Sequence, residues 1–116
     1  MTQWPKEYNP DNWVMIKVNG ENPHYRILVG WDEKNKENND LWKIDQGITR
    51  VEEDKDYFYF YGYGGSVYKC SKQSYYLKDN ILHVWSTIHT QQEDKVELMK
   101  ENTDWLGVDW LLSPKD

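Results

Sequence analysis

Side chains in two early segments of the chain sort into two faces with a period of two residues. Residues 13–18 and 24–31 follow this period, which is that of a β-strand. A turn signal rich in Asn, Gly and Pro separates them at residues 19–23. We therefore predict a hairpin, with Val14, Ile16 and Val18 on one face and Trp13, Met15 and Lys17 on the other, and with Tyr25, Ile27, Val29 and Trp31 sharing a face of its second strand.

A second hairpin is predicted by an unusual run of aromatic residues. Tyrosines stand at positions 57, 59, 61 and 63, and phenylalanines stand at 58 and 60 between them. A strand would show tyrosines on one face and phenylalanines on the other. Gly62, Gly64 and Gly65 favour a tight turn, and residues 67–70 supply the returning strand.

The length of this turn decides which rings face the interior. A two-residue loop would set Tyr61 opposite Tyr68, whereas a three-residue loop would set Phe60 opposite Tyr68 and Phe58 opposite Cys70. Phe and free Cys are commonly buried, and a Tyr hydroxyl needs a polar partner. We favour the second register, which leaves Tyr59 and Tyr61 facing outward.

The rest of the chain indicates further short strands around one core. We predict an irregular lead-in over residues 1–11, a polar loop over 32–40, strands near 41–45, 48–51 and 81–90, and a short helix from 105 to 112. Residues 91–102 suit a helix by composition, but Val96 and Leu98 alternate as in a strand, and we favour the strand. The fold class is thus mainly β or α+β: one domain, 1–116, built as an antiparallel meander of six to eight strands that curls into a barrel, half-barrel or sandwich.

Composition narrows the classes of function. Of 116 residues, 16% are aromatic, with seven Trp and nine Tyr, and the formal net charge is −6 without a cluster of Lys and Arg. This pattern argues against nucleic acid and against an anionic membrane surface as partners. A single cysteine, no signal peptide and no apolar run of about 18 residues favour a cytoplasmic protein.

No familiar catalytic constellation emerges from the chain. The glycines near Gly64 precede a predicted strand rather than the helix that a phosphate loop needs. His83 and His89 would stand about 20 Å apart along a strand, too far to share a metal. Cys70 suits a small core residue, and no two carboxylates are brought together by spacing. We predict no catalytic residue, no metal and no cofactor, and we disfavour an enzyme.

Two binding hypotheses remain, beside the alternative that the rings merely pack on one another. In the first, Tyr59, Tyr61 and Tyr63 form an interaction surface for a second copy or another protein, because Tyr is enriched at such interfaces. In the second, a small apolar or sugar ligand enters a pocket whose candidate residues are Trp31, Trp42, Trp85 and His83.

Its small size, acidic balance and isolated aromatic-rich strands give the chain a general likeness to one group of proteins. It resembles the small single-domain orphan proteins encoded on mobile gene cassettes of the integron type. The resemblance implies a bacterial cytoplasmic protein that is often oligomeric.

Overall fold

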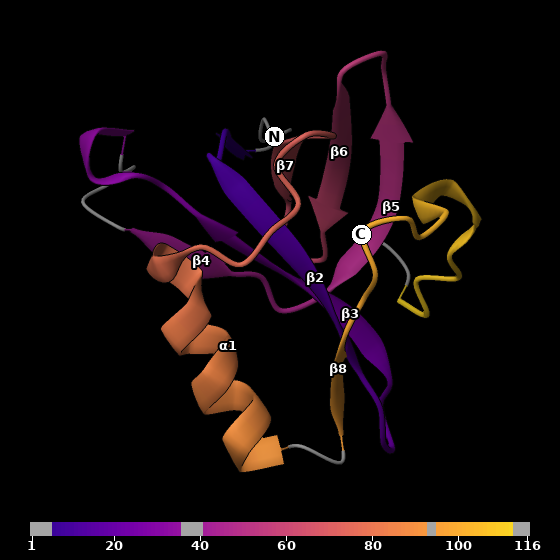
Figure 1. Cartoon of the computed structure of the whole chain (residues 1–116). Coiled ribbons are helices and arrows are strands. Elements are labelled where there is room, and N and C mark those ends of the chain that lie inside the picture. Colours follow the sequence, from indigo (N-terminus) through magenta and orange to yellow (C-terminus); the bar gives the residue numbers. More distant parts are fainter. Residues whose placement is uncertain (1–5, 36–40, 93–94, 113–116) are drawn as a thin grey trace.

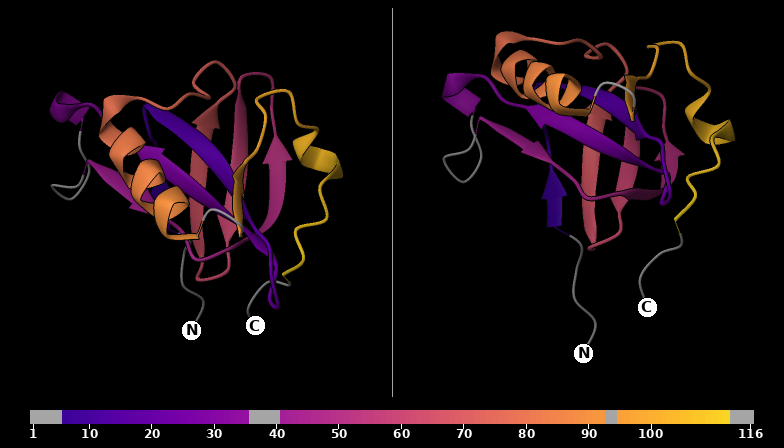
Figure 2. Two further views of the ribbon diagram at one scale, coloured as in Figure 1. Left: turned by 60° about the horizontal axis from the view of Figure 1, so that its bottom comes forward. Right: turned by 90° about the horizontal axis from the view of Figure 1, so that it is seen from below.

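Two four-stranded sheets pack face to face, and a helix covers the far side of one of them (Figure 1; Figure 2). The computed structural model describes residues 6–35, 41–92 and 95–112. The tyrosine sheet has the strand order β1–β7–β6–β5, and the central sheet has the order β4–β3–β2–β8. Their bounds are β1 Lys6–Tyr8, β2 Asn12–Val18, β3 His24–Gly30, β4 Trp42–Ile44, β5 Ile48–Glu53, β6 Tyr57–Gly62, β7 Ser66–Ser71 and β8 Val96–Leu98. The architecture is mainly β and forms a sandwich; the sheets do not close into a barrel.

The central sheet is buried on both faces, which the two residue sets of its first hairpin share between them. One face packs on the tyrosine sheet, around Trp13, Met15, Ile27 and Phe60. Its opposite face packs on the helix α1 (Asp79–Gln92). This second cluster is made of Val14, Ile16, Leu28, Ile81, Val84 and Val96.

The aromatic hairpin adopts the favoured register. Phe60 pairs with Tyr68 and Phe58 with Cys70 across β6 and β7, so the prediction is confirmed. Phe60, Tyr68 and Cys70 are fully buried. The turn is completed by Gly65, whose φ of +98° is in the region that favours glycine.

The strand predicted over residues 81–90 is wrong, because this segment lies within α1. The alternation of Leu82, Val84 and Ile88 suggested a strand, yet Ile81 is buried and Leu82 is exposed. The apolar stripe therefore runs through Ile81, Val84 and Ile88, at helical spacing. The outer face of the central sheet needs an apolar cover, and this stripe supplies it.

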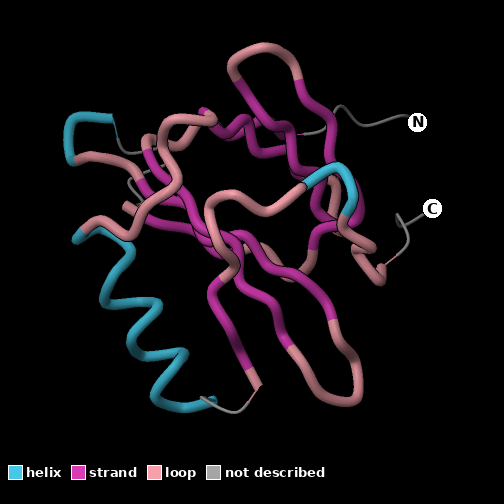
Figure 3. The backbone as a smooth tube through the Cα atoms, turned by 45° about the vertical axis from the view of Figure 1, so that its right-hand side comes forward, coloured by secondary structure: helices cyan, strands magenta, loops and turns pink. Residues whose placement is uncertain are grey.

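The structure also decides three smaller expectations. The segment predicted as an irregular lead-in contains β1, which pairs in parallel with β7. Residues 1–5 of this lead-in and residues 36–40 of the predicted polar loop lie outside the described residues. The favoured strand after α1 is confirmed as β8, which pairs with β2. The predicted C-terminal helix is limited to the single turn η2 (Trp105–Gly107), which lies beside β5 (Figure 3). Trp105 and Trp110 turn inward there and extend the core.

Candidate functional site

The outer face of the tyrosine sheet carries a row of three tyrosines, which we call the tyrosine face. Tyr57, Tyr59 and Tyr61 follow one another along β6 at every second position. They point away from the core because Phe58 and Phe60, between them, point into it. All three rings are half-buried, and each thus offers part of its surface to solvent.

Neighbouring carboxylates hold two of the three hydroxyls. Tyr59 donates a hydrogen bond to Oδ2 of Asp54 at 2.7 Å, and Tyr61 donates one to Oε1 of Glu52 at 2.5 Å. The bond to Asp54 raises the pKa of Tyr59 to about 12. Reciprocally, the bond from Tyr61 lowers the pKa of Glu52, and the bond from Tyr59 lowers that of Asp54. Tyr59 and Tyr61 therefore remain protonated donors throughout the neutral range.

Two cations cover ring faces in the same row. The guanidinium carbon of Arg50 lies 3.6 Å from the ring centroid of Tyr61, and Nζ of Lys69 lies 4.5 Å from that of Tyr57. Arg50 also forms an ion pair with Glu52 at 3.3 Å. The rings are consequently held in place before any partner arrives, which lowers the conformational entropy lost on binding.

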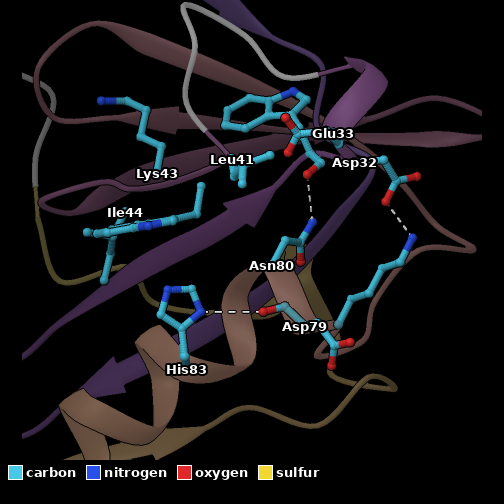
Figure 4. Close-up of a pocket in the computed structure, with 11 residues that line it drawn as sticks. Asp32, Glu33, Leu41, Lys43, Ile44, Asp79, Asn80 and His83 are labelled. Atoms are coloured by element: carbon cyan, nitrogen blue, oxygen red, sulfur yellow. Dashed lines mark hydrogen bonds and ion pairs between the residues drawn. The ribbon is translucent and has the colours of Figure 1, made fainter.

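A separate groove of about 880 Å³ lies between β4, the short helix η1 (Glu33–Asn35) and the start of α1 (Figure 4). It brings together three of the predicted binding residues, Trp31, Trp42 and His83. Trp31 is buried and contributes its edge, whereas Trp42 is 40% exposed. The remaining lining residues are Asp32, Glu33, Leu41, Lys43, Ile44, Lys78, Asp79 and Asn80.

Most polar contacts in the groove hold the fold together. Nζ of Lys78 meets Oδ1 of Asp32 at 2.5 Å, and this bond raises the pKa of Lys78. Asn80 donates to the carbonyl of Trp31 at 3.1 Å and exchanges two hydrogen bonds with buried Asn12. These contacts attach the start of α1 to β2 and to the end of β3. Figure 4 shows Asp79 and His83 one helical turn apart beside this attachment.

The other predicted site residues lie elsewhere. Trp85 is half-buried on α1 and packs on the second core cluster, and its ring lies 5.3 Å from that of His89 at a tilt of 35°. It does not line the groove. Tyr63 lies in the turn after β6 and is 41% exposed. The aromatic candidates thus divide between the tyrosine face, the turn, the groove and the helix.

Sequence reasoning missed the charged residues that frame the tyrosines. Arg50 and Glu52 face Tyr61 and Tyr59 across β5 and β6, and Asp54 follows them at the next position of the same period. Charged residues at positions 50, 52 and 54 share the period of the strand, although Glu53 between them is charged as well. They could be assigned to this face only with the pairing of β5 and β6 known.

The remaining reactive side chains sit in unreactive settings. Cys70 is fully buried, and burial raises the pKa of its thiol well above the ordinary value. His83 and His89 project from an exposed side of α1. Within residues 6–35, 41–92 and 95–112, no group of three His, Cys, Asp or Glu side chains converges on a point where a metal ion could sit.

Comparison with protein-family models, with curated proteins and with solved structures found no match to this chain. In the described part of the chain, α1 and the other helical segments are too short or too polar to cross a membrane.

Proposed function

We propose that this chain is a non-catalytic interaction protein that associates with a second copy of itself through the tyrosine face. The observation that carries the proposal is the row of three half-buried tyrosines, fixed by Asp54, Glu52, Arg50 and Lys69 on a sheet face turned to solvent. Tyr and Arg supply large contact area together with hydrogen-bonding tips, and they dominate binding energy at protein interfaces.

The dimensions of the sheet set the strength of this association. Three strands of six residues and β1 of three residues cover roughly 340 Å² per copy at about 4.8 Å between strands and about 3.4 Å per residue. A pair would bury about 700 Å², below the roughly 1,200 Å² of stable complexes. We therefore expect a transient dimer with a dissociation constant of about 10 µM to 1 mM.

Sedimentation equilibrium between about 5 and 500 µM tests the proposal. We expect the weight-average mass to rise with concentration in the wild type. The rise should vanish in a Tyr59→Ala, Tyr61→Ala variant whose circular dichroism is unchanged. Tyr76→Ala is the matched control, since it removes a ring that is 45% exposed outside the tyrosine sheet. A wild type that remains monomeric throughout, or an equal effect of the control, would contradict the proposal.

Binding of a small apolar or sugar ligand in the groove is a second candidate function. It is favoured by the exposed indole of Trp42, which stands at the wall of an 880 Å³ groove beside Leu41 and Ile44. Titration with cyclohexanol and with glucose, neither of which fluoresces, tests it when it is followed by tryptophan fluorescence. A saturable shift that Trp42→Phe abolishes would support this function, and an unchanged spectrum with both probes would oppose it.

A cytoplasmic setting belongs to the same proposal. It is supported by a lone cysteine that is buried and reduced. The resemblance to cassette-encoded proteins and the bacterial origin that it implies stay predictions.

A further inference from the structure

Charges on the tyrosine face form two cross-strand rows of opposite polarity. The first row runs from β5 to β1 through the registered neighbours Arg50, Tyr61, Val67 and Glu7. The second runs through Glu52, Tyr59 and Lys69. Read in the same direction, the first row begins with a cation and ends with an anion, and the second begins with an anion and ends with a cation.

This pattern complements itself under one two-fold rotation. The rotation axis lies in the plane of the interface and runs perpendicular to the strands, between the two rows. A rotation of 180° about this axis places the first row of one copy over the second row of the other. Arg50 then meets Glu52 of the second copy, and Glu52 meets its Arg50. At the far end, Lys69 comes next to Glu7. Because the operation is two-fold, each contact occurs twice and the assembly closes as a dimer.

We infer that two copies pack their tyrosine sheets face to face about this axis, with a ring of four charges formed by Arg50 and Glu52 of both chains. The inference rests on the proposed function and specifies its geometry. Both side chains are available, since Arg50 is 50% exposed and Glu52 is 57% exposed. The strands of the two sheets run nearly antiparallel, within the offset of about 30° that twisted sheets adopt when they stack.

The rings of Tyr59 and Tyr61 form the centre of this contact, and Val67 lies beside them on the outer face with 6% of its surface exposed. The rotation places Lys69 of one copy over Val67 of the other, while Arg50 and Glu52 lie on the opposite side of the two rings. Apolar surface flanked by charged groups is the usual anatomy of an interface. An axis parallel to the strands is the competing arrangement. It would instead set Arg50 over Glu7 of the second copy, and Glu52 would then face no cation of that copy.

Charge-reversed variants, mixed in pairs, distinguish these arrangements. In a dimer of two Arg50→Glu chains, a glutamate at position 50 faces Glu52, and in a dimer of two Glu52→Arg chains, an arginine at position 52 faces Arg50. Because like charges then meet, each variant alone should associate at least about tenfold more weakly than the wild type. An equimolar mixture restores opposite charges at both contacts of the mixed dimer. Neither chain of the mixture retains its internal Arg50–Glu52 pair, and any recovery therefore arises between chains.

We expect sedimentation at low salt to show dimers in the Arg50→Glu and Glu52→Arg mixture and monomers in each variant alone. A mixture of Arg50→Glu with Glu7→Lys is the matched control, and it should show no dimer beyond what the Glu7→Lys chain forms with itself, since that chain keeps Arg50 and Glu52. If association is restored only in the mixture of Arg50→Glu with Glu7→Lys, the two-fold axis runs parallel to the strands, and the axis that we infer is wrong. A wild-type dimer unaffected by all three substitutions would overturn the charge arrangement while leaving self-association intact. A monomeric wild type would overturn the proposed function itself.

Discussion

Removal of one buried hydroxyl, by Tyr68→Phe, probes the contact that joins the two sheets of the sandwich. Tyr68 has no exposed surface, and its hydroxyl donates to Oδ2 of Asp45 at 2.6 Å. The backbone N–H of Gly47 donates to the other carboxylate oxygen at 2.9 Å. Asp45 directly follows β4 of the central sheet, and Tyr68 is in β7 of the tyrosine sheet. The substitution retains the ring and its stacking on Tyr8, and it therefore isolates the hydrogen bond.

The cost follows from the charge and burial of the acceptor. A hydrogen bond to a charged group contributes about 1.5–3 kcal/mol, and a buried carboxylate that loses a donor keeps its desolvation penalty. We therefore expect Tyr68→Phe to lower the free energy of unfolding by about 2–3 kcal/mol. For a domain of this size the melting temperature should fall by roughly 10 °C.

Urea unfolding followed by tryptophan fluorescence measures this change, with an unchanged m-value as evidence that the folded and unfolded states stay comparable. The same substitution in an Asp45→Asn background is the control. With a neutral acceptor, the loss of the Tyr68 hydroxyl should cost only about 1 kcal/mol. A loss below about 0.5 kcal/mol in the wild-type background, or equal losses in both backgrounds, would refute the claim that a carboxylate-bound hydroxyl links the sheets.

Three further outcomes are expected. Gly62→Ala would place a Cβ 2.5 Å from Oδ2 of Asp45 and should lower the free energy of unfolding in urea by about 1–3 kcal/mol. At Gly64 an added Cβ meets no atom within 4 Å, and Gly64→Ala should change this free energy by less than about 0.5 kcal/mol. Equal effects of the two variants would contradict the close approach of Gly62 to Asp45. Trp85→Ala should cost about 1–2 kcal/mol in the same assay, less than the roughly 3–5 kcal/mol of a fully buried indole, because this ring is half-buried; a loss above about 3 kcal/mol would place it in the core. In a rapid pH jump read by tyrosinate absorbance, Tyr59 should ionise near pH 12, since its pKa is raised to about 12 from an ordinary value of 10.0. The hydrogen bond of Tyr59 contributes fully to stability below pH 10, and its contribution is lost as the pH rises towards 12. The wild-type titration curve minus that of Tyr59→Phe isolates this group, and a difference centred near pH 10 would argue against the hydrogen bond to Asp54.

Local pattern predicted most of the strands and one register in detail. The alternation in β2 and β3 correctly separated Val14 and Ile16 from Trp13 and Met15, and the two sets lie in different core clusters on the two sides of the central sheet. The pairing of Phe58 with Cys70 could be predicted because a hairpin closed by glycines is short, and only one of its two registers buries the apolar set. The outward position of Tyr59 and Tyr61 followed from the same choice.

Contacts between distant segments decided the rest. Residues 81–90 contain β-branched and aromatic side chains that suit a strand, and they become helical because a stripe through Ile81 and Val84 covers the central sheet. The groove depends on that helix, since Asp79, Asn80 and His83 reach β4 only when α1 forms.

The two charge rows likewise require pairings across the whole tyrosine sheet. The sequence by itself determined which faces are apolar, because side-chain direction alternates locally along a strand. Which faces meet, and which charges become neighbours, depended on strand order, and strand order is set by burial summed over the entire chain.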